Sequence, residues 1–201
     1  MIYGRLGSIS VGDKYPVRLI GVLNCSLESF YRKSIAKSDK EIIKKAIEIQ
    51  EEGADIIDVG GASTAPRSIY GYDSHVPTSV EKARISRAIP LIKDTCDLPI
   101  SVDTKNAEVA EEALKKGAEI LNDVSGLKND PKMLKVVKEY TPDLILMAAN
   151  NKPGDVYSPI DIINVLNKSI EIALECGIKP EQITVDPGFG FGKNAEENIL
   201  I

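Results

Sequence analysis

The sequence predicts an α/β fold, a TIM (β/α)8-type barrel of which about six β/α units can be counted. Short, continuously apolar runs alternate with amphipathic helical patterns along nearly the whole chain, which is typical of parallel strands covered by helices. A short motif also repeats: residues 53–58 (GADIID) and 117–122 (GAEILN) each place a glycine after a helix and end a strand on a polar side chain. A doubly wound open sheet has the same cadence and is the alternative.

Six strands are predicted from runs rich in Ile, Val and Leu. In chain order they cover residues 17–24, 55–59, 99–103, 119–123, 143–147 and 182–186. Ahead of the first strand, residues 2–3 and 8–11 predict a small hairpin that would plug the N-terminal end of a barrel. Because no linker or low-complexity segment interrupts the pattern, we expect one domain over residues 1–201.

Helices fill the intervals between these strands. The first is predicted over residues 39–52, where Ile42, Ala46 and Ile49 recur at helical spacing. The next four cover residues 79–94, 106–116, 131–140 and 161–176, and a last helix begins near Ala195. Glycine follows the patterns that end at residues 52 and 116, as expected of a helix C-cap.

Composition excludes several classes of function. The 201 residues include 25 basic and 30 acidic side chains, a net charge of −5, whereas a nucleic-acid binder usually has a basic excess or stripe. The longest apolar run is well short of the roughly 18 residues of a membrane span, and residues 1–10 lack a signal-peptide pattern. Three widely spaced cysteines without a CxxC pair predict a reduced, cytoplasmic protein.

A single histidine limits the metal and nucleophile chemistry further. An HExxH zinc site needs two histidines, and a Ser-His-Asp triad would have to use His75, for which an exposed loop position is the simpler interpretation. The glycine-rich segment 188–193 (GFGFGK) does not have the spacing of a GxxxxGK[ST] phosphate loop.

Polar side chains end five of the predicted strands: Asn24, Asp58, Asp103, Asn122 with Asp123, and Asp186. The carboxyl ends of parallel strands form the ligand site in such folds. Local capping or turn formation is the alternative for each residue, and it explains Asp58 and Asp123 most readily. Asp103 and Asp186 directly follow apolar runs, which favours a binding site at these strand ends.

These strand-end residues suit a flat heterocycle with an amide-like edge and an exocyclic amine, because carboxylates and amides match its donors and acceptors. Asn24, with loop hydroxyls, could help hold a hydrated Mg²⁺ and its phosphate. Arg67 could contact an anion. The glycines of residues 188–192 would let the backbone approach a ligand, or they simply form tight turns.

Five motifs, in order, resemble those of the dihydropteroate synthase family, part of a superfamily of pterin-binding barrels. Residues 21–30 (GVLNCSLESF) are similar to its first signature, GxxNxTPDSF, and residues 53–66 (GADIIDVGGASTAP) to its second, GAxxIDIGGESTRP. Residues 101–104 (SVDT), 121–126 (LNDVSG) and 186–193 (DPGFGFGK) match three more. The resemblance runs from about Val17 to the C-terminus and suggests a diverged or archaeal-type relative.

The resemblance implies a transferase of folate or related pterin-cofactor biosynthesis. It would join 6-hydroxymethyl-7,8-dihydropterin pyrophosphate to para-aminobenzoate or a related arylamine and release pyrophosphate. Asp103, Asn122 and Asp186 would bind the pterin edge, with Met147 against the ring. Asn24 would orient Mg²⁺ and the pyrophosphate, so the implied catalytic residues are Asn24, Asp103 and Asp186.

The arylamine and pyrophosphate side matches the family less well. The resemblance assigns to it Ser63, Thr64, Arg67, Gly190 and Phe191. Ala62 and Ala65 stand where the family has Glu and Arg, and Arg67 is the nearest substitute. Residues 147–150 (MAAN) stand where the family usually has Met-His, and residues 26–28 (SLE) replace Thr-Pro-Asp.

Two alternatives follow from these departures. A pterin-binding methyltransferase domain would use the same pterin residues with a methyl-tetrahydropterin and a corrinoid partner, and it needs no pyrophosphate site. A non-catalytic pterin-binding module is the other. The 201 residues also fall short of the roughly 250 of an eight-unit barrel. We therefore expect two C-terminal β/α units to be missing, and a homodimer or a further C-terminal region to cover the open sheet.

Overall fold

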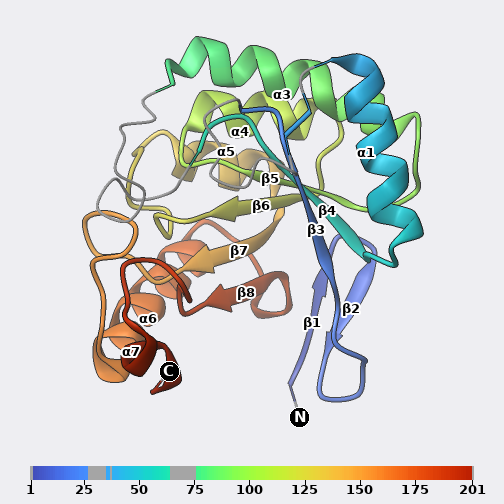
Figure 1. Cartoon of the computed structure of the whole chain (residues 1–201). Coiled ribbons are helices and arrows are strands. Elements are labelled where there is room, and N and C mark those ends of the chain that lie inside the picture. Colours follow the sequence, from blue (N-terminus) through green and yellow to red (C-terminus); the bar gives the residue numbers. More distant parts are fainter. Residues whose placement is uncertain (1, 27–34, 37, 64–75, 201) are drawn as a thin grey trace.

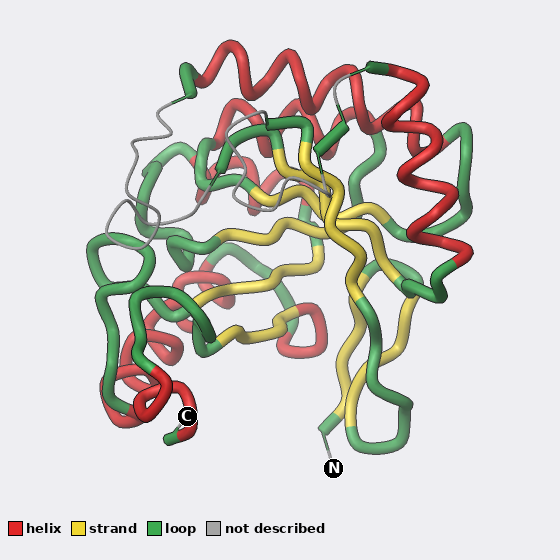
Figure 2. The backbone as a smooth tube through the Cα atoms, viewed as in Figure 1, coloured by secondary structure: helices red, strands yellow, loops and turns green. Residues whose placement is uncertain are grey.

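The structure is a computed structural model that describes residues 2–26, 35–36, 38–63 and 76–200. Six parallel strands form one curved sheet in the order of the sequence (Figures 1 and 2). They are β3 (Ile20–Asn24), β4 (Ile56–Gly60), β5 (Ile100–Asp103), β6 (Ile120–Asp123), β7 (Asp143–Met147) and β8 (Ile183–Asp186). A doubly wound sheet reverses its strand order part-way, so that alternative is wrong. Within the described residues the sheet does not close, which confirms the incomplete barrel.

The helices lie on the outer, convex face of the sheet (Figure 1). They are α1 (Asp39–Glu51), α3 (Thr78–Lys93), α4 (Ala107–Lys116), α5 (Met133–Tyr140), α6 (Pro159–Glu175) and α7 (Ala195–Ile199), with a 3₁₀ turn η2 (Pro180–Gln182) before β8. Ser38 begins α1 through a capping box with Glu41, and Gly117, at φ 108°, ends α4 in a left-handed cap. Among the described helices, none has both the length and the apolar character needed to cross a membrane.

Alternation along the strands separates two apolar layers. Residues such as Leu23, Val59 and Leu121 point outward and are fully buried under the helices. Their neighbours in sequence point into the lumen. The first strand is shorter than predicted: it begins at Ile20, opposite Ile56, because the apolar Val17 is 89% exposed and pairs with no strand.

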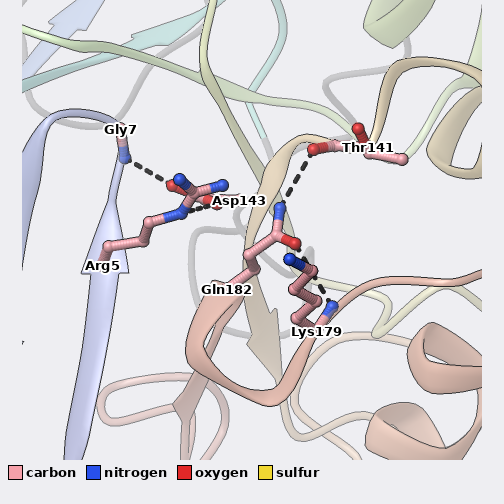
Figure 3. A network of polar contacts seen from close by, with 6 residues as sticks. All are labelled: Arg5, Gly7, Thr141, Asp143, Lys179 and Gln182. Atoms are coloured by element: carbon pink, nitrogen blue, oxygen red, sulfur yellow. Dashed lines mark hydrogen bonds and ion pairs between the residues drawn. The ribbon is translucent and has the colours of Figure 1, made fainter.

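The predicted N-terminal hairpin is confirmed as β1 (Tyr3–Leu6) paired antiparallel with β2 (Ile9–Gly12). Leu6 packs into the lumen against Ile56, Ile120 and Ile145. Below this apolar layer, Arg5 Nε and the Gly7 backbone N–H donate to the two carboxylate oxygens of Asp143, at 3.1 and 2.8 Å (Figure 3). The hairpin therefore closes the end of the sheet where the strands begin, leaving their carboxyl ends for a ligand site.

The same polar network fixes the entry to β8. Gln182 Nε2 donates to the Thr141 carbonyl at 3.1 Å, and the Lys179 backbone N–H donates to Gln182 Oε1 at 3.2 Å (Figure 3). Thr141 precedes β7, so these bonds tie the starts of β7 and β8 together.

Candidate active site

Strand register brings the predicted polar residues to one edge of the sheet. Asn24 on β3 lies opposite Gly60 on β4, Gly60 opposite Asp103 on β5, and Asp103 opposite Asn122 on β6. Residues two positions apart in a strand point to the same face of the sheet, so Asp58 lies on the same face as Gly60. This face is the lumen, and the row forms one wall of a site at the carboxyl ends.

Met147 and Asp186 continue this wall from the ends of β7 and β8, where they lie opposite each other. Met147 is fully buried, and the Gly188 backbone N–H donates to Asp186 Oδ1 at 2.7 Å. A side chain at residue 188 would begin 3.4 Å from Met147 Sδ, so glycine leaves this space open. Burial raises the pKa of Asp186, while the Gly188 N–H and the Lys193 ammonium act in the opposite direction.

Asp58 is joined to the site through Asn122. Asn122 Nδ2 donates to Asp58 Oδ2 at 3.1 Å, although β5 lies between the two strands. Asp58 is 8% exposed, and neither its Oδ1 nor Ser101 Oγ makes a hydrogen bond of normal geometry. Burial raises the pKa of Asp58, opposed by Ser101 and Asn122. The contact between Asp58 and Asn122 crosses from β4 to β6, so it is neither a helix cap nor a local turn.

Asp123 behaves as the sequence predicts and organises its own loop. Its carboxylate accepts hydrogen bonds from the Ser125 backbone N–H at 2.8 Å, the Ser125 hydroxyl at 2.6 Å and the Leu127 backbone N–H at 3.0 Å. Burial raises the pKa of Asp123 against these bonds. The residue therefore fixes the turn after β6 and holds the end of the strand that carries Asn122.

Asn24 faces the gap left by a glycine. A Cβ at residue 60 would lie 2.8 Å from Asn24 Oδ1, so glycine is needed here for the amide to occupy its place. The Cys25 backbone N–H donates to the Gly60 carbonyl at 2.8 Å, which continues the strand pairing past the end of β3. Among the described residues there is no group of three or more His, Cys, Asp or Glu side chains that could hold a metal.

The residues predicted for the arylamine and pyrophosphate side are only partly described. Ser63 lies just after β4 and is half-buried. Thr64, Arg67 and His75 lie outside the described residues. Gly190 is exposed and Phe191 half-buried in the loop after β8; the Gly190 backbone N–H donates to Asn198 Oδ1 at 3.1 Å.

Sequence reasoning did not predict the burial of two charged residues beside the site. Glu81, on α3, is 3% exposed; it accepts from the Thr104 hydroxyl and from Asn106 Nδ2, each at 2.6 Å. Nothing in the sequence distinguishes it from an ordinary acid in the first turn of a helix. Lys193 is 9% exposed and donates from Nζ to the Gly188 carbonyl at 2.8 Å. Its place in the DPGFGFGK motif was a signal, but its burial was not evident.

Comparisons with known proteins identify the family of the chain. The sequence model of the family described as pterin binding enzyme matches residues 20–201. Dihydropteroate synthase of Clostridium beijerinckii is 39% identical in an alignment 202 positions long, which covers 97% of this chain and 71% of that protein. A structure of dihydropteroate synthase from Coxiella burnetii in complex with pteroic acid has a TM-score of 0.81 at 31% identity and covers 100% of this chain and 72% of that one.

A third relative is also a dihydropteroate synthase. The structure of Xanthomonas albilineans dihydropteroate synthase with 4-aminobenzoic acid has a TM-score of 0.75 at 32% identity. It covers 90% of this chain, and this chain spans 65% of it. By the family match, these identities and the ordered motifs at the strand ends, the chain belongs to the dihydropteroate synthase family of pterin-binding enzymes.

Proposed function

We propose that the protein joins 6-hydroxymethyl-7,8-dihydropterin pyrophosphate to an arylamine, para-aminobenzoate or a related compound, and releases pyrophosphate. The C–O bond to pyrophosphate breaks with its electron pair on the leaving group, the amine lone pair forms the C–N bond, and the amine proton is lost. The observation that carries the proposal is the shared strand-end wall of Asp103 and Asn122 with Met147 and Asp186. Relatives solved with pteroic acid and with 4-aminobenzoic acid support the two substrate classes.

The pterin half of the site would act by hydrogen bonding and charge. A carboxylate accepts two hydrogen bonds, which suits Asp186 to the amine and ring N–H of a pterin edge. Asp58 accepts one Asn122 Nδ2 hydrogen, so the Asn122 carbonyl oxygen is set to accept from the ligand. Met147 would pack on the ring.

The Asp103 and Asp186 carboxylates would also stabilise positive charge that develops on the pterin during the reaction. As pyrophosphate leaves, positive charge grows on the methylene carbon and spreads into the pterin ring. Preorganised negative groups stabilise such charge most in a partly buried site, and Asp103 and Asp186 are both partly buried. In the proposed mechanism these two carboxylates bind the ring and lower the barrier to C–O cleavage.

Mg²⁺ fits the amide corner of the site. Mg²⁺ takes oxygen ligands, and substrate phosphates and waters commonly fill most of its shell, so Asn24 Oδ1 would be its ligand from the protein. When bound, the ion would neutralise charge on the departing pyrophosphate. Ser63, Thr64 and Arg67 would contact the anion, and Gly190 and Phe191 would flank the arylamine.

The protein would work as a cytoplasmic enzyme. All three cysteines are buried free thiols, as a reducing compartment allows. We propose that a second copy of the protein, or a C-terminal region, covers the open edge of the sheet.

One titration tests the proposed reaction. The protein is mixed with the pterin pyrophosphate and Mg²⁺, and pyrophosphate is measured before and after 4-aminobenzoate is added. We expect release that depends on the arylamine. Binding of a methyl-tetrahydropterin with no response to pyrophosphate or arylamine would instead identify a methyltransferase-type domain, and the synthase proposal would be wrong.

A further inference from the structure

Lys193 occupies an unusual position for a lysine. It precedes Asn194, the N-cap of α7, yet it is 9% exposed, and its Nζ donates to the Gly188 carbonyl at 2.8 Å. Long cationic side chains normally reach solvent. Here the ammonium turns back under the loop that follows β8, toward the wall formed by Met147 and Asp186.

Gly188 connects Lys193 to Asp186. Its N–H donates to Asp186 Oδ1 at 2.7 Å, and its carbonyl accepts from Lys193 Nζ. Gly188 has φ +78°, and a Cβ there would lie 3.3 Å from Lys193 Nζ. A larger residue would therefore crowd the ammonium in a backbone conformation that side chains rarely adopt. The Asp186 carboxylate and the Lys193 ammonium therefore bind the N–H and the carbonyl of the same glycine.

Neighbouring segments hold Lys193 in this buried place. Asn194 and Glu197 form a capping box that begins α7, and Asn198 Nδ2 donates to the Lys193 carbonyl at 3.1 Å. A Cβ at Gly192 would lie 2.7 Å from the Gly154 carbonyl oxygen, so the loops after β7 and β8 pack closely. These contacts fix the backbone on both sides of Lys193.

The hydrogen bond to Gly188 does not require a charged donor, yet burying the Lys193 ammonium costs free energy. A neutral amide could also donate to the Gly188 carbonyl, whereas burial of an ammonium is unfavourable unless countercharges offset it. Burial lowers the pKa of Lys193, and the carboxylates of Asp186, Glu197 and Asp155 act in the opposite direction. Of these three carboxylates, Asp186 has the largest effect on the pKa of Lys193, and it alone lies on the strand-end wall.

We infer that Lys193 is a positioning residue of the pterin site, which clamps the Asp186 turn through Gly188 and supplies the countercharge for the Asp186 carboxylate. This rests on the proposed pterin site and adds to it a residue that acts through Asp186 without touching the ligand. Asp186 must be ionised to accept two hydrogen bonds from a pterin edge, so loss of the countercharge should weaken binding most on the acid side.

The test is the pH dependence of pterin binding. Affinity for 6-hydroxymethylpterin is measured by calorimetry from pH 5 to 8 for the wild-type protein, Lys193→Gln, Lys193→Arg and Lys116→Met. Lys193→Gln keeps a donor and removes the charge, Lys193→Arg keeps the charge, and Lys116 is an exposed lysine of α4. We expect Lys193→Gln to weaken binding about tenfold at the acid end, the change that one pKa unit produces, and much less at pH 8. Lys193→Arg should restore the wild-type profile, and Lys116→Met should leave it unchanged.

Two results would overturn the inference. Equal weakening by Lys193→Gln at every pH would show a structural role only, and an unchanged profile would show no role. Thermal melts confirm folding, and Lys193→Met is a second neutral variant if the glutamine variant does not fold. A wild-type protein that binds no pterin at any pH would instead refute the proposed function, and this inference with it.

Discussion

Asn122 on β6 donates from Nδ2 to Asp58 Oδ2 on β4, at 3.1 Å and across the intervening strand β5. The bond fixes which end of the Asn122 amide is nitrogen and which is oxygen. An unconstrained amide can turn over and exchange its donor for its acceptor. Asp58 therefore decides what Asn122 presents to a ligand in the lumen.

This relationship predicts different effects for two substitutions of Asp58. Asp58→Ala removes the acceptor, frees the Asn122 amide and should raise the Kd for 6-hydroxymethylpterin by about tenfold, equivalent to one hydrogen bond. Asp58→Asn retains an oxygen that can accept and removes a buried charge, so its Kd should stay within about threefold of wild type and its Tm should not fall. Calorimetry and thermal melts measure both. Equal loss of affinity in the two variants would mean that the charge of Asp58, and not its positioning of Asn122, matters.

Asp186→Asn should weaken pterin binding severely. The substitution replaces a carboxylate that can accept two hydrogen bonds by an amide that offers a donor to a donor, and charged hydrogen bonds contribute about 1.5–3 kcal/mol each. We expect a Kd at least about 100-fold higher, measured by calorimetry with 6-hydroxymethylpterin. Asp94→Asn, on an exposed residue at the end of α3, is the matched control. Pterin affinity that survived the Asp186 change would show that the pocket is placed wrongly.

Glu81 should stabilise the loop that follows Asp103. Its carboxylate accepts from the Thr104 hydroxyl and from Asn106 Nδ2, and Glu81→Gln would set its amide donor against one of these donors. A buried donor left without a partner costs about 1–3 kcal/mol, so the Tm should fall by roughly 2–12 °C for a domain of this size.

The control for Glu81 is Glu108→Gln. Glu108 is exposed and lies 3.9 Å from Lys132 Nζ, a surface contact that contributes little. Its Tm should therefore stay within about 1–2 °C of wild type. If both variants melted at the wild-type temperature, Glu81 would not hold the loop.

The sequence predicts the strands and their ends because both depend on local pattern. An apolar run such as residues 100–102 specifies a buried strand, and the polar residue after it, Asp103, must then lie at the carboxyl edge. Parallel register does the rest and brings Asp103 beside Asn122. The same logic extends the first strand too far, because Val17 is apolar but has no partner strand.

The missed features depend on contacts between distant parts of the chain. Glu81 is buried by its bonds to residues 23 and 25 positions away, and Asp58 meets Asn122 across 64 positions. Periodicity says which face a residue lies on, but not which side chain from another element reaches it. Lys193 is buried because two loops pack together, a relationship that neither loop carries in its own sequence.

Cys25 makes stability depend on pH in the alkaline range. Burial raises the pKa of its thiol to about 11, against the positive charges of Arg84 and Arg87, from 9.0 for an unperturbed thiol. Below pH 9 the thiol is neutral in both folded and unfolded states. Between pH 9 and 11 only the unfolded state loses the proton, so the free energy of unfolding falls, by about 2–3 kcal/mol in all.

The comparison that isolates this effect is between wild type and Cys25→Ala. Urea unfolding at pH 8.5, 9.5 and 10.5 gives the free energy of unfolding of each, and lysines and tyrosines contribute equally to both. The wild-type value should fall more steeply with pH than that of the variant. Parallel pH profiles would contradict a buried neutral thiol.

The absence of a side chain at Gly21 allows α1 to pack closely on β3. A Cβ at residue 21 would overlap Ile49 Cγ2 and lie 3.3 Å from Ala54 Cβ, and Ile49 is 5% exposed. Gly21→Ala should therefore destabilise the protein by about 1–3 kcal/mol, the usual cost of overpacking. Equilibrium urea unfolding measures the change.

A double-mutant cycle with Ile49 identifies the cause. Ile49→Ala deletes Cγ2 and should make Gly21→Ala much less costly, with a coupling energy of about 1–2 kcal/mol. Ile49→Val retains a methyl at the Cγ2 position, so in that background the cost of Gly21→Ala should remain. Ile49→Ala alone should cost about 2–5 kcal/mol through the cavity it leaves. If neither background relieved Gly21→Ala, the penalty would arise from the strand backbone and not from contact between β3 and α1.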